Sequence, residues 1–141
     1  MAKKTPYARA KARALKVYSE YIRKKEADAD GMVHCVTCKK RFHWTQVQCG
    51  HGMAGRGNNI LFCADLCHCQ CKYCNIFKGG DYDNYHKYLI DRYGMDRYDE
   101  LLLLKNGKDA KGNTVITKFT IGGLEKMIQG WKEEMKGFKC Q

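Results

Sequence analysis

Two pairs of cysteines are the residues of this sequence best suited to metal chemistry. They are Cys35-Val-Thr-Cys38 and Cys71-Lys-Tyr-Cys74. A CxxC turn lets two thiolates bind one ion, and two such turns complete a closed tetrahedral zinc site with four sulfur ligands. The spacing therefore predicts one structural Zn²⁺ held by Cys35, Cys38, Cys71 and Cys74. His43 is a weaker alternative ligand, and buried cysteine without metal is the plain alternative.

The chain contains nine cysteines in 141 residues. The odd number and the lack of a visible secretory signal favour reduced thiols and metal binding over a disulfide framework. The remaining five are not expected to be ligands, and their role stays open. They are Cys49, Cys63, Cys67, Cys69 and Cys140.

A second candidate site lies between and around the cysteine pairs. Gln48-Cys49-Gly50-His51 precedes a glycine-rich loop. We expect a strand that ends at His51, followed by this loop, a short strand and a helix anchored by the metal. Together these elements would form a ββα arrangement. His68 and Asn75 are two helical turns apart, which places them near one face if the segment is helical. We expect His51, His68 and Asn75 to converge on a site for Mg²⁺ or Mn²⁺, with His51 as general base. Each histidine taken singly is more often structural.

Positive charge is concentrated in the first helix and in the cysteine- and histidine-rich segment. The net charge is +11 at pH 7. Such a surface favours a polyanionic partner, most commonly nucleic acid, whereas the plain alternative is a solvated basic helix. The side chains expected to contact phosphate are Lys11, Arg13, Lys16, Arg23 and Arg56. No apolar run approaches the roughly 18–20 residues that span a bilayer, so no membrane partner is expected.

The pattern of expected helices and strands, which must position these residues, indicates an α+β fold with three parts. These are an N-terminal basic helix (1–30), a zinc-anchored ββα core (31–80) and a C-terminal helical extension (81–141). Helical periodicity and turn residues predict helices at 8–25, 71–78, 81–93, 96–104 and 124–136. Strands are expected at 34–38, 42–49 and 60–62, and residues 114–120 form a strand or an extended linker. The tyrosines of 81–93 are expected to pack in the core rather than to stack on bases.

The order of the motifs resembles the phage NinG (Rap) recombination endonucleases, within the HNH/treble-clef nuclease group. The resemblance covers about residues 11–104, and its most specific part is His68-Cys-Gln-Cys-Lys-Tyr-Cys-Asn75. The other matching segments are Tyr18–Arg23, Asp28–Gly31, Cys35–Cys38, His43-Trp44, Gly50-His51, Arg56, Gly79 or Gly80, Tyr85, Leu89 and Tyr93-Gly94. Two positions depart from the family pattern. Many relatives have an acidic residue at the position of Gln48 and Asn at that of Leu66; Gln48 can still coordinate an ion through its carbonyl oxygen.

The resemblance implies a metal-dependent DNA endonuclease that acts in phage recombination on branched or partly single-stranded DNA, in the cytoplasm of the bacterial host. His51 corresponds to the histidine of the family's Gly-His motif, and Asn75 to the residue in the final HNH position. Two other functions stay open: a non-catalytic zinc module that binds DNA or RNA, and a structural zinc protein that binds another protein. The sequence leaves both a monomer and a homodimer open.

Overall fold

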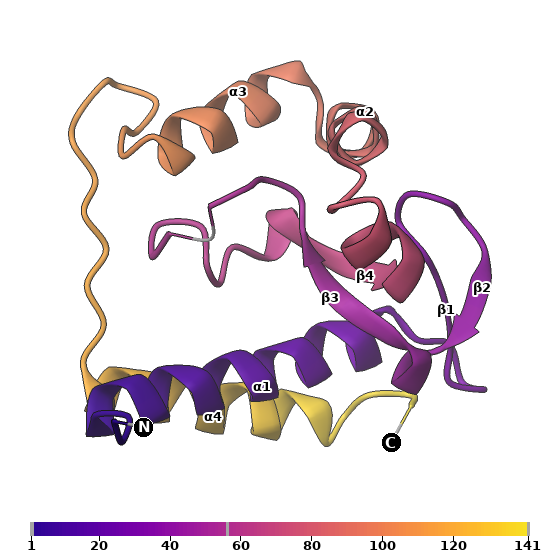
Figure 1. The fold of residues 1–141 in the computed structure, drawn as a ribbon, viewed down its shortest axis with the longest axis horizontal. Helices are drawn as coiled ribbons and strands as arrows, with labels where there is room; N and C mark the ends of the chain where they lie inside the picture. The colour runs from indigo at the N-terminus through magenta and orange to yellow at the C-terminus, as the bar shows by residue number, and fades with distance from the viewer. Residues whose placement is uncertain (1, 56, 141) are drawn as a thin grey trace.

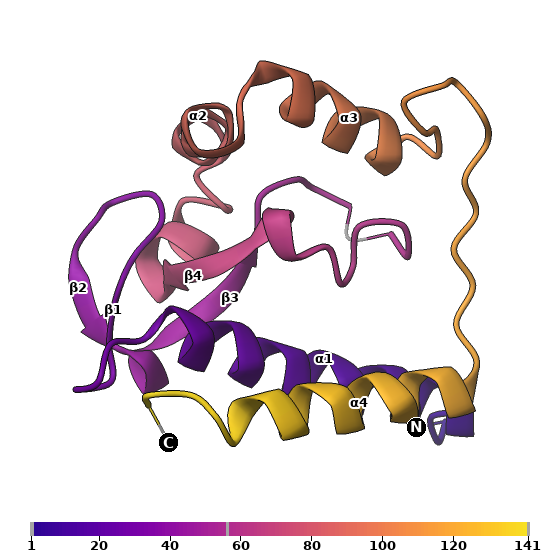
Figure 2. The same ribbon diagram turned by 180° about the vertical axis from the view of Figure 1, so that it is seen from behind.

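The chain folds into helices around two small antiparallel sheets (Figures 1 and 2). The computed structural model describes residues 2–55 and 57–140. The helices are α1 (Pro6–Glu26), α2 (Tyr82–Tyr93), α3 (Met95–Lys105) and α4 (Ile121–Met135). The strands are β1 (Met32–His34), β2 (Arg41–His43), β3 (Val47–His51) and β4 (Cys67–Cys71). Three short helical turns are η1 (Trp44–Gln46), η2 (Ala64–Leu66) and η3 (Tyr73–Phe77).

Helices α1 and α4, from opposite ends of the sequence, lie side by side and run in the same direction (Figure 1). The hydroxyl of Thr5 caps α1 by accepting a hydrogen bond from the amide of Ala8 at 3.1 Å, and Pro6 suits the first turn because it needs no amide donor there. The apolar stripes of the two helices face each other, with Ala14 and Leu124 fully buried between them. The basic N-terminal helix is therefore held by packing against the end of the chain.

The two-stranded sheet of β3 and β4 lies between α1 and the pair α2–α3 (Figure 1). Its antiparallel register pairs Val47 with Cys71 and His51 with Cys67. A smaller hairpin of β1 and β2 carries the first cysteine pair at its turn. On the far side of β3–β4, a core of Met53, Leu66, Tyr85, Leu89 and Leu101 joins α2 and α3 to the loop that follows β3. The expected burial of tyrosine from 81–93 is confirmed at Tyr85.

The predicted helices agree with α1, α2, α3 and α4 to within a few residues. All three strand predictions need correction. The strand expected at 34–38 is β1, which ends at His34, because residues 35–38 form the turn that carries the first cysteine pair. The 42–49 segment is interrupted by η1, residues 60–62 form a turn whose Ile60 and Leu61 are buried, and β4 takes the place of the missing strand. The segment 71–78 forms the five-residue turn η3 instead of a longer helix, and 114–120 is extended, with a single bridge between Thr114 and Lys108.

Two further observations bear on the expected organisation. Within residues 2–55 and 57–140 no helix is both long and apolar enough to cross a membrane. The fold is mixed α+β, with small antiparallel sheets and a cluster of four cysteines. The three-part division at residues 30 and 80 stays a prediction; the last helix of the third part packs against the helix of the first part.

Candidate metal centre and adjoining polar cleft

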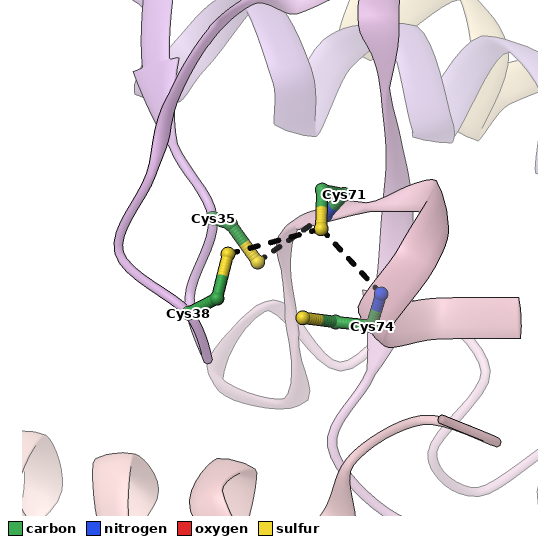
Figure 3. A group of neighbouring side chains, drawn as sticks. All are labelled: Cys35, Cys38, Cys71 and Cys74. Carbon is green, nitrogen blue, oxygen red and sulfur yellow. Dashed lines mark hydrogen bonds between the residues drawn. The ribbon is translucent and has the colours of Figure 1, made fainter. Parts of the chain in front are cut away.

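The four cysteines of the two CxxC pairs come together at one point (Figure 3). Their sulfur atoms all lie within 4.8 Å of one another, and Cys38 Sγ and Cys71 Sγ are 3.8 Å apart. Sulfurs around one tetrahedral zinc, each about 2.3 Å from the ion, would be about 3.8 Å apart. Cys35, Cys38, Cys71 and Cys74 are thus placed to hold a metal ion, and the arrangement is compatible with structural zinc.

Local backbone geometry explains why the first pair turns inward. The chain reverses after β1, and Lys39, with φ of 65°, adopts the left-handed conformation that closes the turn. The amide of Lys39 donates to the carbonyl of Cys35 at 2.9 Å, and the amide of Cys35 donates to the carbonyl of Lys40 at 2.9 Å. The amide of Val36 also donates to the carbonyl of Cys69 at 2.8 Å, which ties the turn to β4.

The second pair is positioned by the end of β4 and by η3. Cys71 is the last residue of β4, and Cys74 lies buried within the turn that follows (Figure 3). The amide of Cys71 donates to Cys35 Sγ at 3.3 Å, and the amide of Cys74 donates to Cys71 Sγ at 3.4 Å. Amide donors aimed at sulfur stabilise thiolate, the form of cysteine that binds metal.

The electrostatic environment of Cys35 differs from that of the other three thiols. Burial acts to raise the pKa of Cys35, but the hydrogen bond from the Cys71 amide and further bonds from Thr37 outweigh it and lower the pKa to about 6. For Cys38, Cys71 and Cys74 burial is the largest influence, and their pKa values are raised. A set of four soft, largely buried sulfurs fits a thiophilic ion such as Zn²⁺ rather than Mg²⁺ or Ca²⁺.

The remaining sulfur and histidine candidates lie outside this cluster. His43 Nδ1 bonds to the Thr45 hydroxyl at 2.8 Å and caps η1. Among the described residues, only the four cysteines of the CxxC pairs form a cluster that could hold a metal. Cys67 and Cys69 are buried in β4, and burial raises the pKa of Cys69; the pKa of Cys67 is raised first by its hydrogen bond with Cys49 and then by burial.

A polar cleft lies beside the cysteine cluster, between α1, the end of β3 and η3. His51, Gln48 and Asn75 line it, and Asn75 Nδ2 donates to Gln48 Oε1 at 2.7 Å. The cleft continues past Cys49 to Lys11. The same cleft is therefore lined by three predicted site residues, His51, Gln48 and Asn75.

The imidazole of His51 is held in a fixed orientation. Its Nε2 lies 2.9 Å from the carbonyl oxygen of Leu61. Because a carbonyl only accepts, Nε2 is the ring nitrogen that donates this hydrogen bond. Glycine suits the preceding position, since a Cβ on Gly50 would crowd the buried side chain of Gln70 and lie 2.9 Å from its Cβ. Tyr85 fixes the same strand end by donating its hydroxyl proton to the carbonyl of Gly50 at 2.6 Å.

His68 does not join this cleft, which corrects the expected convergence of three residues. Its Nδ1 lies 3.0 Å from Glu26 Oε2, and its Nε2 lies 3.0 Å from the Tyr93 hydroxyl and 3.1 Å from the carbonyl of Asp65. It lines a separate cavity with Glu26, Tyr88 and Tyr93. The reason is that His68 lies on a strand, so the helical spacing to Asn75 does not apply.

The basic residues expected to bind phosphate are distributed over several surfaces. Lys11 borders the cleft and donates to Asn58 Oδ1 at 2.8 Å, and Lys16 is exposed. Arg13 pairs with Glu125 of α4 at 3.4 Å. Arg23 donates to carbonyl groups of Ser19 and Trp44 and stacks over the Trp44 ring. Arg56 lies outside the described residues.

The polar cleft has a neutral donor set for a hard metal ion. No Asp or Glu is among the described residues that line it. Asp65 bonds to Arg97 at 2.9 Å instead, and Leu66 is fully buried in the core. Magnesium is usually held by one or two carboxylates, waters and substrate phosphates. The amide oxygens of Gln48 and Asn75 fit a divalent ion here only together with a phosphate oxygen that supplies negative charge.

The sequence did not reveal the positioning role of two residues. Glu26 ends α1 and accepts a hydrogen bond from the amide of Cys69 at 3.1 Å as well as contacting His68, so it joins α1 to β4. Tyr85 joins α2 to both strands of the hairpin, because its hydroxyl also accepts from the amide of His68 at 3.0 Å. Tyr85 was expected only as a core tyrosine and as a position that matches the family, and Glu26 only as an acidic residue at the end of a helix; neither signal indicates these hydrogen bonds.

Comparison with known proteins supplies the remaining evidence. Searches of curated proteins and of solved structures each gave no match. The family described as Bacteriophage Lambda NinG protein matches residues 2–140, which is nearly the whole chain, including both cysteine pairs and the polar cleft. The chain therefore belongs to the bacteriophage lambda NinG protein family.

Proposed function

We propose that this protein is a metal-dependent DNA endonuclease of the HNH/treble-clef group, which acts in phage recombination within the cytoplasm of the bacterial host. The observation that carries the proposal is the cleft in which His51, Gln48 and Asn75 lie together beside four clustered cysteines. Membership of the NinG family supports a phage function. DNA with branches or single-stranded portions is the proposed substrate.

In this proposal the four cysteines hold a structural Zn²⁺. The ion would join the β1–β2 turn to the β4–η3 segment, and it would thereby set the position of Asn75, the residue directly after Cys74. The sulfur cluster leaves no position for water or substrate, because four protein ligands complete the tetrahedral shell. Its contribution is to folding and to the shape of the cleft, whereas the hydrolytic chemistry belongs to His51.

His51 is the proposed general base. Its ring is oriented by the hydrogen bond from Nε2 to the carbonyl of Leu61. In its neutral form the imidazole would take a proton, at Nδ1, from a water molecule attacking the phosphodiester. Gln48 and Asn75 would hold Mg²⁺ or Mn²⁺ together with the phosphate of the DNA. When bound, the divalent ion supplies positive charge that offsets the charge developing on the phosphate and leaving oxygen. Lys11, at the far end of the cleft, is placed to contact a neighbouring phosphate.

The central test compares His51→Ala with the control His34→Ala, which changes an exposed histidine outside the cleft. Both variants and the parent are incubated with linear, nicked, flapped and four-way DNA, with and without Mg²⁺ or Mn²⁺. We expect His51→Ala to lose roughly 10²–10⁴ in cleavage rate, with zinc content and DNA affinity nearly unchanged, because a base lowers the barrier rather than strengthening binding. Cleavage by His51→Ala at the parental rate would show that the proposed mechanism is wrong.

A second variant separates the metal role from the base. Asn75→Ala removes one amide oxygen while His51 remains, so we expect cleavage to require a higher concentration of Mg²⁺ or Mn²⁺. A lower maximal rate with an unchanged metal requirement would instead assign Asn75 to positioning Gln48, its hydrogen-bond partner.

The alternative function is a non-catalytic zinc module that binds DNA or RNA. The observation in its favour is that no carboxylate is found among the described residues lining the cleft. The same assay decides between the two, because parental protein that binds DNA but never cuts it under any divalent ion would support the binding module.

A further inference from the structure

The turn η3 exposes an unusual set of large apolar side chains. Tyr73, Ile76 and Phe77 are 61%, 51% and 74% exposed, respectively. The rings of Tyr73 and Phe77 are stacked on each other, with centroids 6.0 Å apart and planes inclined by 29°. A contiguous exposed apolar patch, unlike single scattered apolar residues, is typical of an interaction surface. The surface formed by Tyr73, Ile76 and Phe77 is called the aromatic surface below.

The backbone beneath the aromatic surface is firmly anchored. Cys74, the second residue of the turn, is fully buried and belongs to the cysteine cluster (Figure 3). The amide of Lys78 donates to the carbonyl of Tyr73 at 2.9 Å, and the amide of Gly80 donates to the carbonyl of Cys74 at 3.1 Å. Rings held on a fixed turn lose little conformational entropy when they bind, so the exposed side chains are preorganised for contact.

The charge around the aromatic surface matches a polyanion. Lys72 and Lys78 flank the rings and are exposed, and Lys78 Nζ lies 5.8 Å from the centre of the Tyr73 ring. The nearest acidic residue along the chain, Asp81, is only 12% exposed and lies 3.9 Å from Lys78 Nζ. A second copy of the chain would bring two pairs of lysines together, whereas a nucleic acid supplies phosphates for them.

The aromatic surface is linked to the polar cleft through Asn75. Asn75, whose amide reaches Gln48 inside the cleft, lies on the same turn between Tyr73 and Ile76. One five-residue turn thus directs Cys74 to the sulfur cluster, Asn75 to the cleft, and the two rings to solvent. DNA whose phosphate occupied the cleft would have its adjoining nucleotides beside Tyr73 and Phe77.

We infer that the aromatic surface stacks on unpaired bases next to the phosphate held in the cleft, and that it selects DNA containing such bases. The inference rests on the proposed function in taking DNA as the ligand, but it requires no cleavage. Aromatic rings stack on single-stranded bases regardless of sequence, whereas bases within an intact duplex are already stacked on one another. Tyr73 and Phe77 are therefore specificity residues for unpaired DNA.

The test measures binding rather than cleavage. Parent, Phe77→Ser, Tyr73→Ser and the conservative Phe77→Trp are titrated, without added Mg²⁺ or Mn²⁺, against two fluorescent DNAs of equal length: a continuous duplex and a duplex with a short single-stranded gap. Ile116→Ser is the matched control, because Ile116 is equally exposed at 73% but lies in the extended linker before α4. The zinc content of each variant verifies that the turn is intact.

We expect Phe77→Ser and Tyr73→Ser to weaken binding to gapped DNA by roughly 5- to 150-fold, the range for removal of one base–aromatic stack. Binding to the continuous duplex should stay unchanged, and Phe77→Trp should restore binding to gapped DNA. Equal weakening on both DNAs, or no weakening on either, would overturn the inference. So would a dimeric parent that Phe77→Ser converts to a monomer, because the surface would then be an interface between copies. Selective weakening in a protein that never cuts DNA would support the inference while refuting the nuclease proposal.

Discussion

Replacing Tyr85 with phenylalanine tests whether one buried hydroxyl holds the end of β3 in place. Tyr85 is fully buried between α2 and the β3–β4 hairpin. Its hydroxyl donates to the carbonyl of Gly50 at 2.6 Å and accepts from the amide of His68 at 3.0 Å. Phenylalanine keeps the ring and its packing, so the change removes these two hydrogen bonds and a longer contact of 3.3 Å with the carbonyl of Leu66, which still accepts from the amide of Gly52. Gly50 directly precedes His51, which makes the strand end a part of the proposed site.

The expected loss of stability follows from the two backbone groups left without the Tyr85 hydroxyl. A buried donor or acceptor without a partner costs about 1–3 kcal/mol. For two such groups, whose surroundings relax in part, we expect the free energy of unfolding to decrease by about 2–4 kcal/mol. Since about 1.4 kcal/mol is tenfold, the equilibrium constant for unfolding should rise roughly 30- to 1,000-fold.

The assay is urea-induced unfolding of the metal-loaded protein, followed by circular dichroism. Tyr98→Phe is the matched control, because the Tyr98 hydroxyl makes one partly buried hydrogen bond, to His86 Nδ1 at 3.1 Å. Its expected destabilisation is about 0.5–1.5 kcal/mol, the usual net value of one hydrogen bond. If Tyr85→Phe is no more destabilising than Tyr98→Phe, the hydroxyl of Tyr85 does not pin the hairpin and the reasoning fails.

Three further predictions concern the metal, the basic helix and alkaline pH. Cys74→Ser should abolish binding of one zinc per chain and unfold the domain, because structural zinc contributes folding free energy; elemental analysis finding no zinc in well-folded parent would contradict this. Replacing Lys11 and Lys16 with glutamine should reduce the slope of log affinity against log salt by about 0.9 for each duplex phosphate that these lysines neutralise, and an unchanged slope would show that neither binds phosphate. Burial and the hydrogen bond to Glu134 raise the pKa of Tyr21 from 10.0 to about 12. The stability that this shift contributes is fully present below pH 10 and disappears as the pH rises to 12. Tyr21→Phe should therefore make the free energy of unfolding, measured with urea, depend less steeply on pH in that interval.

Features that depend on residues close together in the sequence could be predicted well. Apolar residues at helical spacing specified α1, α2 and α4, because a helix forms from contacts three and four residues apart. The CxxC spacing likewise identified the four cysteines that meet in the sulfur cluster, since each pair depends on one local turn. Net charge and its concentration in the first helix are properties of composition alone.

The arrangement of the polar cleft depended on contacts between distant parts of the chain. β4 consists of Cys, His and Gln, which are not typical strand formers, and it is a strand because it pairs with β3. That pairing turns His68 toward Glu26 and Tyr93, away from Asn75, and no helical spacing could reveal it. Gln48 and Asn75 meet because the sulfur cluster and the hairpin bring their segments together.

The basic residues show the same difference between what the sequence determines and what the tertiary structure determines. The sequence by itself determined that α1 is rich in positive charge, but only the tertiary structure decided which charges face solvent. Arg13 is paired with Glu125 and Arg23 is held by Trp44, whereas Lys16 stays exposed and Lys11 borders the cleft. The physical reason is that residue types and their local spacing are properties of the sequence itself. The partner of a charged or polar group, in contrast, depends on which segments, far apart in the sequence, pack together.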